Sequence, residues 1–96
     1  MSYSAGMARE LGLSALLYMT GQPELIAGFI GRTGLDPDDL RGMAADSDLA
    51  LHVLDYLTED DSRVLDAARA LGIPATDFMV ARTALAGPGS HGWDVD

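Results

Sequence analysis

The sequence contains no cysteine, no lysine and no long hydrophobic run. Without cysteine there can be no disulfide, no thiol chemistry and no cysteine-based metal site, and cytoplasmic is the default location. The longest apolar stretches are about ten residues, half of what a membrane-spanning helix needs. Residues 1–6 also lack the basic start and apolar run of a signal peptide. We therefore expect a cytoplasmic protein with no membrane partner.

Positive charge is scarce. The six basic residues are all arginine, and they stand against fifteen acidic residues, for a net charge of −9. Binding to phosphate groups needs a basic face, so nucleic acid is not expected as a partner. An acidic chain could instead bind a basic protein or imitate nucleic acid. Many of the acids precede predicted helices, however, where a carboxylate caps backbone N–H groups and opposes the helix dipole. Capping and solubility account for most of the charge.

The chain is long enough for one domain with one core, and it contains one stretch twice. Residues 11–20 reappear as residues 49–58, a shift of 38 positions, with Leu, Leu, Leu, Tyr and Thr at matching places. Under the same shift, Gly34–Leu35 falls on Gly72–Ile73. Two matches that share one shift indicate an internal duplication.

Both repeated stretches are apolar on nearly all sides, which is typical of helices in the middle of a core. We predict two equivalent central helices. Their structural side chains are Leu13, Leu16 and Tyr18 in the first, and Leu51, Leu54 and Tyr56 in the second. Gly34 and Gly72 are predicted to end the helix that follows each central helix.

Caps, prolines and apolar periodicity predict an all-α protein with six helices. The predicted helices span residues 7–20, 24–33, 37–45, from the cap at 46–48 to about 58, from the cap at 58–61 to 71, and 74–86. Inward positions outside the central helices are Leu25, Ile26, Phe29, Ile30, Leu40, Met43, Ala44, Val64, Leu65, Ala68, Leu71, Phe78, Ala81 and Leu85.

The predicted domain spans residues 7–86, between a disordered N-terminus at 1–6 and a Gly/Pro-rich tail at 87–96. Two copies are too few for an open solenoid. We therefore predict a compact six-helix bundle made of two three-helix repeats, about 11–48 and 49–86, related by a pseudo-twofold axis.

The runs Phe29–Pro37 and Val53–Leu57 resemble a family of short alphaproteobacterial proteins that is catalogued only as a domain of unknown function. The resemblance covers roughly Ala8 to Trp93. It rests on helix caps and core positions, so it implies a small all-helical cytoplasmic protein and carries over no catalytic residue.

Three glycines at Gly28, Gly31 and Gly34 superficially suggest a phosphate-binding loop. The dinucleotide fingerprint needs a different spacing, with a strand before it and a helix after it. We predict instead that Gly28 and Gly31 allow a neighbouring helix to come close, and that Gly34 ends their helix.

A polar stripe on the second central helix is the strongest candidate for chemistry. It consists of Asp48, His52, Asp55 and Glu59, at i, i+4, i+7 and i+11. Such a row could bind a divalent metal or position a general base. The matching places in the first copy hold Glu10, Ser14, Leu17 and Gly21, so the stripe is not part of the shared scaffold. The alternative is that the stripe is simply the solvent edge of a buried helix. We favour that interpretation and expect no metal or other cofactor.

Three aromatic residues have two interpretations each. Tyr18 and Tyr56 could line a ligand cleft between the repeats, or pack their rings in the core. Trp93, the only tryptophan, could dock on its own protein or on a dimer mate, or remain free as an anchor for a partner.

Apolar residues make up 48% of this small chain, which favours a dimer or a partner groove unless tight packing hides them all. We therefore expect a small acidic helical protein–protein interaction module without catalysis, whose partner includes a second copy of itself as a homodimer. Two alternatives stay open. One is a metal- or acid–base-dependent enzyme that uses His52 with Asp48, Asp55 or Glu59. The other is a carrier that holds a small apolar ligand between the repeats.

Overall fold

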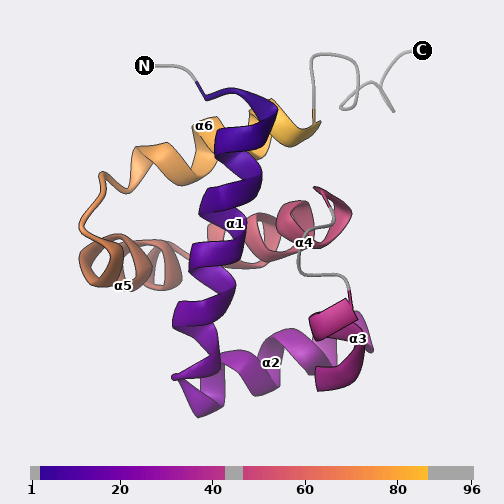
Figure 1. The fold of residues 1–96 in the computed structure, drawn as a ribbon. Helices are drawn as coiled ribbons and strands as arrows, with labels where there is room; N and C mark the ends of the chain where they lie inside the picture. The colour runs from indigo at the N-terminus through magenta and orange to yellow at the C-terminus, as the bar shows by residue number, and fades with distance from the viewer. Residues whose placement is uncertain (1–2, 43–46, 87–96) are drawn as a thin grey trace.

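The computed structural model describes residues 3–42 and 47–86, and within these ranges it contains six α-helices and no strand (Figure 1). The helices are α1 (Ala5–Thr20), α2 (Pro23–Thr33), α3 (Pro37–Gly42), α4 (Ser47–Thr58), α5 (Asp61–Leu71) and α6 (Thr76–Ala86). The predicted all-α bundle is confirmed. The predictions for Met43, Ala44 and the tail with Trp93 lie outside the described residues.

The first and last helices begin elsewhere than the sequence predicts. The Ser4 side chain accepts a hydrogen bond from the Met7 backbone N–H at 3.1 Å, so α1 starts at Ala5, earlier than predicted. Ser4 therefore caps α1, and the first turn includes Ala5 and Gly6, two residues of the N-terminus that we expect to be disordered. At the other end of the fold, Ala75 lies in a turn, and α6 begins at Thr76 rather than at Pro74.

Gly34 and Gly72 end α2 and α5 as predicted. Both adopt the left-handed conformation, with φ of 76° and 71°, and their backbone N–H groups donate to Ile30 O and Ala68 O. Glycine takes this conformation without a steric penalty because it has no Cβ atom. The chain can therefore reverse direction at equivalent places in its two halves.

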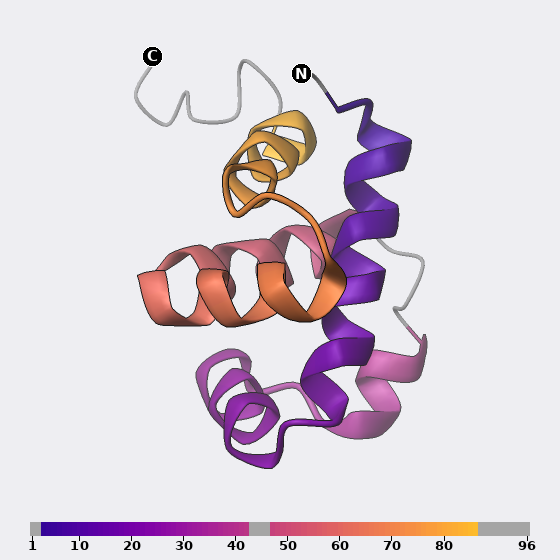
Figure 2. The same cartoon turned by 90° about the vertical axis from the view of Figure 1, so that its left-hand side faces the viewer.

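The long helix α1 runs along one side of the molecule (Figures 1 and 2). From its N-terminus to its C-terminus it is crossed by α6, then α4, then α2, while α5 lies beside α4. None of the helices in the described ranges is long and apolar enough to cross a membrane.

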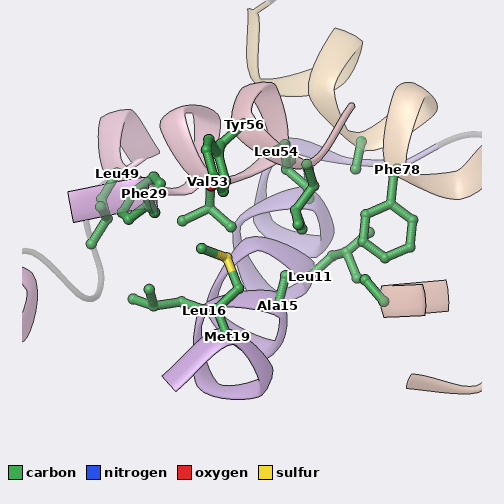
Figure 3. Close-up of a cluster of buried hydrophobic side chains, with 14 of the residues drawn as sticks. Leu11, Ala15, Leu16, Met19, Phe29, Leu49, Val53, Leu54, Tyr56 and Phe78 are labelled. Atoms are coloured by element: carbon green, nitrogen blue, oxygen red, sulfur yellow. The ribbon is translucent and has the colours of Figure 1, made fainter. Parts of the chain in front are cut away.

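The core lies between α1 and α4 and is closed by one phenylalanine from α2 and one from α6. Phe29 of α2 and Phe78 of α6 are fully buried, as are Met19 of α1 and Val53 and Leu54 of α4 (Figure 3). Burying one large apolar side chain contributes about 1.5–3 kcal/mol. The repeated stretches therefore supply the centre of the fold, as predicted.

The two central helices meet backbone to backbone at Gly12. A Cβ atom placed on Gly12 would lie 2.6 Å from the Ala50 Cβ atom and 2.9 Å from its Cα atom. The crossing thus has no room for a second methyl group. Ala50 is the residue that corresponds to Gly12 under the 38-residue shift, so the two copies touch at matching positions.

Other matching positions agree only in part. Leu16 and Leu54 are both buried, whereas Leu51 is half-buried and Leu13 is 36% exposed. Leu17 is 64% exposed, so α1 is not covered on nearly all sides, contrary to the prediction. The helix lies at the edge of the molecule (Figure 2), and Leu13 and Leu17 are among its exposed residues.

The third helices of the two halves differ most. The short α3 spans six residues, whereas α6 spans eleven and packs across both central helices. The pseudo-twofold relation therefore stays a prediction, and the first two helices of each half are the part that could obey it.

One predicted inward residue of α5 is wrong. Leu65 is 53% exposed, whereas Ala67 and Ala68 are buried and Val64 and Leu71 pack against the core. The buried positions follow the i, i+3, i+4, i+7 spacing of one helix face, and Leu65 falls outside that stripe.

Candidate functional site

A cleft of about 690 Å³ opens where α1 passes into α2 and α4 passes into α5. We call it the tyrosine cleft, because Tyr18 and Tyr56 both line it. Its lining includes three further pairs related by the 38-residue shift, namely Gln22 with Asp60, Glu24 with Ser62 and Leu25 with Arg63. Corresponding corners of the two halves therefore face each other across the cleft.

Tyr56 forms the buried wall of the tyrosine cleft. It is only 6% exposed, and its ring meets Phe29 edge to face, with centroids 5.5 Å apart. Arg63 covers the ring, with its Cζ atom 4.0 Å from the centroid, and its Nη1 atom donates to the Tyr56 backbone oxygen at 2.8 Å. The core interpretation of Tyr56 is thus correct, and it is compatible with a place in the cleft.

Gly28 makes room for the hydroxyl end of Tyr56. A Cβ atom on Gly28 would overlap the Tyr56 hydroxyl oxygen and would lie 3.5 Å from the ring carbon that carries it. The prediction that Gly28 permits a close helix is correct. For Gly31 it is wrong, because no atom of the described residues outside its own stretch of helix lies within 4 Å of the position its Cβ atom would take.

Tyr18 is less buried than Tyr56, and the residue seven positions after it is not an arginine. The residue that corresponds to Arg63 in the first half is Leu25, which also lines the cleft and is partly buried. One tyrosine is thus covered by a cation, and the other lies on the side of the cleft where an aliphatic residue replaces that cation.

The charge of the tyrosine cleft is negative on balance. Three carboxylates line it, Glu24, Asp60 and Asp66, against the single guanidinium of Arg63. Asp60 also caps α5, since it accepts a hydrogen bond from the Ser62 N–H at 2.8 Å. All three acidic residues are exposed.

The polar stripe of α4 serves mainly to tie helices together. Asp55 pairs with Arg82 of α6. Glu59 accepts hydrogen bonds from the Nη1 and Nη2 atoms of Arg32 in α2, and its Oε1 atom lies 3.6 Å from the Nη1 atom of Arg63 in α5. Asp55 in α4 and Glu59, which directly follows the end of α4 at Thr58, therefore link this part of the chain to α2, α5 and α6.

The remaining members of the stripe, Asp48 and His52, are exposed, as expected for the solvent edge of a helix. Within residues 3–42 and 47–86, no group of three or more histidine, cysteine or acidic side chains is arranged to hold a metal ion. The structure therefore directs the carboxylates of Asp55 and Glu59 toward arginines rather than toward a common centre.

A family model matches residues 5–88, which takes in all six helices. The chain belongs to the family described as protein of unknown function DUF3572. The match confirms the resemblance to a domain of unknown function, although it ends at residue 88 and not near Trp93. No curated protein and no solved structure matches the chain.

Two contacts of this DUF3572 protein shift the pKa values of their members. Hydrogen bonding to Arg32 lowers the pKa of Glu59, and the same bond raises the pKa of Arg32. Burial, followed by the hydrogen bond that the Tyr3 hydroxyl donates to Asp77 at 2.8 Å, raises the pKa of Tyr3. These ion pairs and hydrogen bonds join residues 27 to 74 positions apart, so no local sequence signal could have revealed them.

Proposed function

We propose that this protein is a small acidic interaction module without catalysis that binds a segment of a partner protein in the tyrosine cleft. The observation that carries the proposal is the pairing of Tyr18 and Tyr56 across an open cleft with exposed carboxylates at its rim. Tyrosine is enriched at protein interfaces because it combines a large apolar ring with a polar end. The volume of about 690 Å³ lies in the range of natural binding sites.

The charges of the described residues argue against both alternatives, the ligand carrier and the enzyme. A small apolar ligand would have to remove water from Glu24, Asp60, Asp66 and Arg63, and removing water from charges without pairing them is costly. An enzyme built on the α4 stripe would have to release the carboxylates of Asp55 and Glu59 from their arginine partners before they could act as bases or metal ligands. A peptide segment can instead supply its own hydrogen bonds and charges.

The test is site-specific photo-cross-linking in the source cell. A photo-reactive amino acid at Ser62 lies in the cleft, and one at the exposed Ala70 of the same helix does not. We expect a defined cross-linked protein from position 62, lost in the Tyr18→Asp background, and none from position 70. Equal cross-linking from both positions would contradict the proposal.

Self-association is a second candidate, favoured by the uncovered face of α1. Leu13 and Leu17 lie one turn apart and are 36% and 64% exposed. A second copy could cover this pair, and the net charge of −9 on each copy would make the dimer stronger at higher salt.

Sedimentation velocity tests this surface with a matched pair of variants. Leu17→Gln should weaken the dimer, and Leu65→Gln, at the 53% exposed leucine of α5, should not. A wild-type protein that stays monomeric at its highest soluble concentration would rule out the homodimer and leave the partner in the tyrosine cleft.

A further inference from the structure

We infer that the tyrosine cleft receives an arginine side chain from a basic segment of the partner protein. This inference rests on the proposed function and names the chemistry of the partner. It begins with Arg63, whose Cζ atom lies 4.0 Å from the centroid of the Tyr56 ring. A cation over the face of an aromatic ring is attracted by the negative charge of that face. One of the two tyrosines thus already holds an arginine of the chain itself.

The other tyrosine has no cation at the equivalent position. The shift that relates Tyr56 to Tyr18 relates Arg63 to Leu25. Tyr18 and Leu25 are both partly exposed and both line the cleft, so this side offers an aromatic ring and an aliphatic side chain. The methylene stem of an incoming arginine can pack on Leu25 while its guanidinium group lies over the Tyr18 ring with its edge at the polar rim.

The charges at the rim favour a guanidinium group over other side chains. Glu24, Asp60 and Asp66 together carry three negative charges, whereas Arg63 lies 3.6 Å from Glu59 and Arg69 lies 3.7 Å from Asp66, so the rim stays negative on balance. Guanidinium groups bind carboxylates through two parallel hydrogen bonds, which gives geometric selectivity as well as attraction. The net charge of −9 adds long-range attraction for a basic segment. A partner arginine would neutralise part of the negative charge at the rim and would stack on the Tyr18 ring.

The experiment is an NMR titration of the full-length protein with three synthetic peptides of equal length. One alternates arginine with glycine, one lysine with glycine and one glutamate with glycine. We expect the arginine peptide to shift the amide signals of Tyr18 and Ser62 and to bind more tightly than the lysine peptide. The glutamate peptide should leave these signals unchanged.

Two pairs of variants separate the cleft from general charge attraction. Asp66→Asn should weaken binding of the arginine peptide several-fold, and Asp61→Asn should have little effect. Asp61 is an exposed acid of the same helix that does not line the cleft. Tyr18→Leu should weaken binding about 3- to 10-fold through the lost cation–π interaction, and Tyr18→Phe should retain it. Circular dichroism would verify that each variant is folded.

Three results would overturn the inference. They are equal weakening by Asp61→Asn and Asp66→Asn, binding of the glutamate peptide in the cleft, and no binding of the arginine peptide. If the cross-link from Ser62 to a partner persists in any of these cases, the cleft binds a protein of different chemistry and only this inference fails. If that cross-link is also absent, the proposed function fails with it.

Discussion

Replacing Gly28 by alanine should destabilise the protein, although alanine is the better helix former. The change gains about 1 kcal/mol of helix propensity. The new Cβ atom would overlap the Tyr56 hydroxyl oxygen, however. That oxygen cannot move away easily, because the Tyr56 ring is buried between Phe29 and Arg63. Overpacking of this kind costs about 1–3 kcal/mol, so we expect a net loss of up to about 2 kcal/mol.

Gly31 is the matched control in the same helix. In the described part of the chain, no atom of another element lies within 4 Å of its future Cβ atom, so Gly31→Ala should stabilise the protein by about 0.5–1 kcal/mol. The two alanine variants should therefore differ by about 1–3 kcal/mol, which corresponds to at least about 4 °C in melting temperature. Urea denaturation of both variants measures the difference.

A double-mutant cycle with Tyr56→Phe identifies the cause. Without the hydroxyl group, the nearest atom of residue 56 would be the ring carbon at 3.5 Å, which is an ordinary contact. Gly28→Ala should then behave like Gly31→Ala, with a coupling energy of about 1–3 kcal/mol. Additive effects within about 0.5 kcal/mol would refute the proposed contact between Gly28 and the hydroxyl group.

Three further changes test the core, an ion pair and the N-terminal contact. Leu54→Ala should cost about 2–5 kcal/mol in urea denaturation because Leu54 is fully buried, and Leu65→Ala should cost less than about 1 kcal/mol. Glu59→Gln should lower stability above the ordinary pKa of 4.5. This difference should shrink as pH falls through the lower pKa of Glu59 in the folded state, as followed by melting at different pH values. Tyr3→Phe should cost about 1–3 kcal/mol by removing the hydrogen bond to buried Asp77. The contribution of Tyr3 should be complete below its ordinary pKa of 10.0 and be lost as pH rises through its higher pKa in the folded state, so the two stability curves should converge in alkali.

Each of these changes has an outcome that would contradict its basis. Equal losses for Leu54 and Leu65 would place the centre of the core elsewhere. A difference for Glu59 that does not change with pH would mean that its ionisation is not coupled to folding. Parallel alkaline curves for Tyr3 would mean that its hydroxyl group does not bond to Asp77.

The parts of the fold that local chemistry decides were predictable. Gly34 and Gly72 end their helices because a left-handed residue is needed there, and Asp60 caps α5 from one residue away. Such signals involve only neighbouring residues, so they can be read from the chain. The start of α1 was missed because Ser4 was treated as part of a frayed end, although serine is a favoured capping residue.

Contacts between distant residues were not predictable. The bond from Tyr3 to Asp77 and the pairing of Asp55 with Arg82 depend on how α6 lies across the central helices. Periodicity also misplaced Leu65, because leucine is apolar whether or not a helix covers it. The candidate site lies between these extremes. The repeat marked Tyr18 and Tyr56 as a possible pair, but only the structure places Arg63 over one of the rings.

The contact of Gly12 with Ala50 offers a direct test of the duplication. In a twofold arrangement only residues near the axis can touch their own equivalents, and these two are equivalents in contact. If the crossing is symmetric, it has room for one methyl group and should accept it from either side. Gly12→Ala alone should cost about 1–3 kcal/mol, since its Cβ atom would lie 2.6 Å from that of Ala50. In general, an Ala→Gly change inside a helix costs about 1 kcal/mol of helix propensity. Added to Gly12→Ala, however, Ala50→Gly should recover most of the lost stability. The swapped protein should therefore be more stable than Gly12→Ala alone in urea denaturation. If it is less stable, the two positions are not interchangeable, and the matching residues of α1 and α4 would owe their similarity to chance.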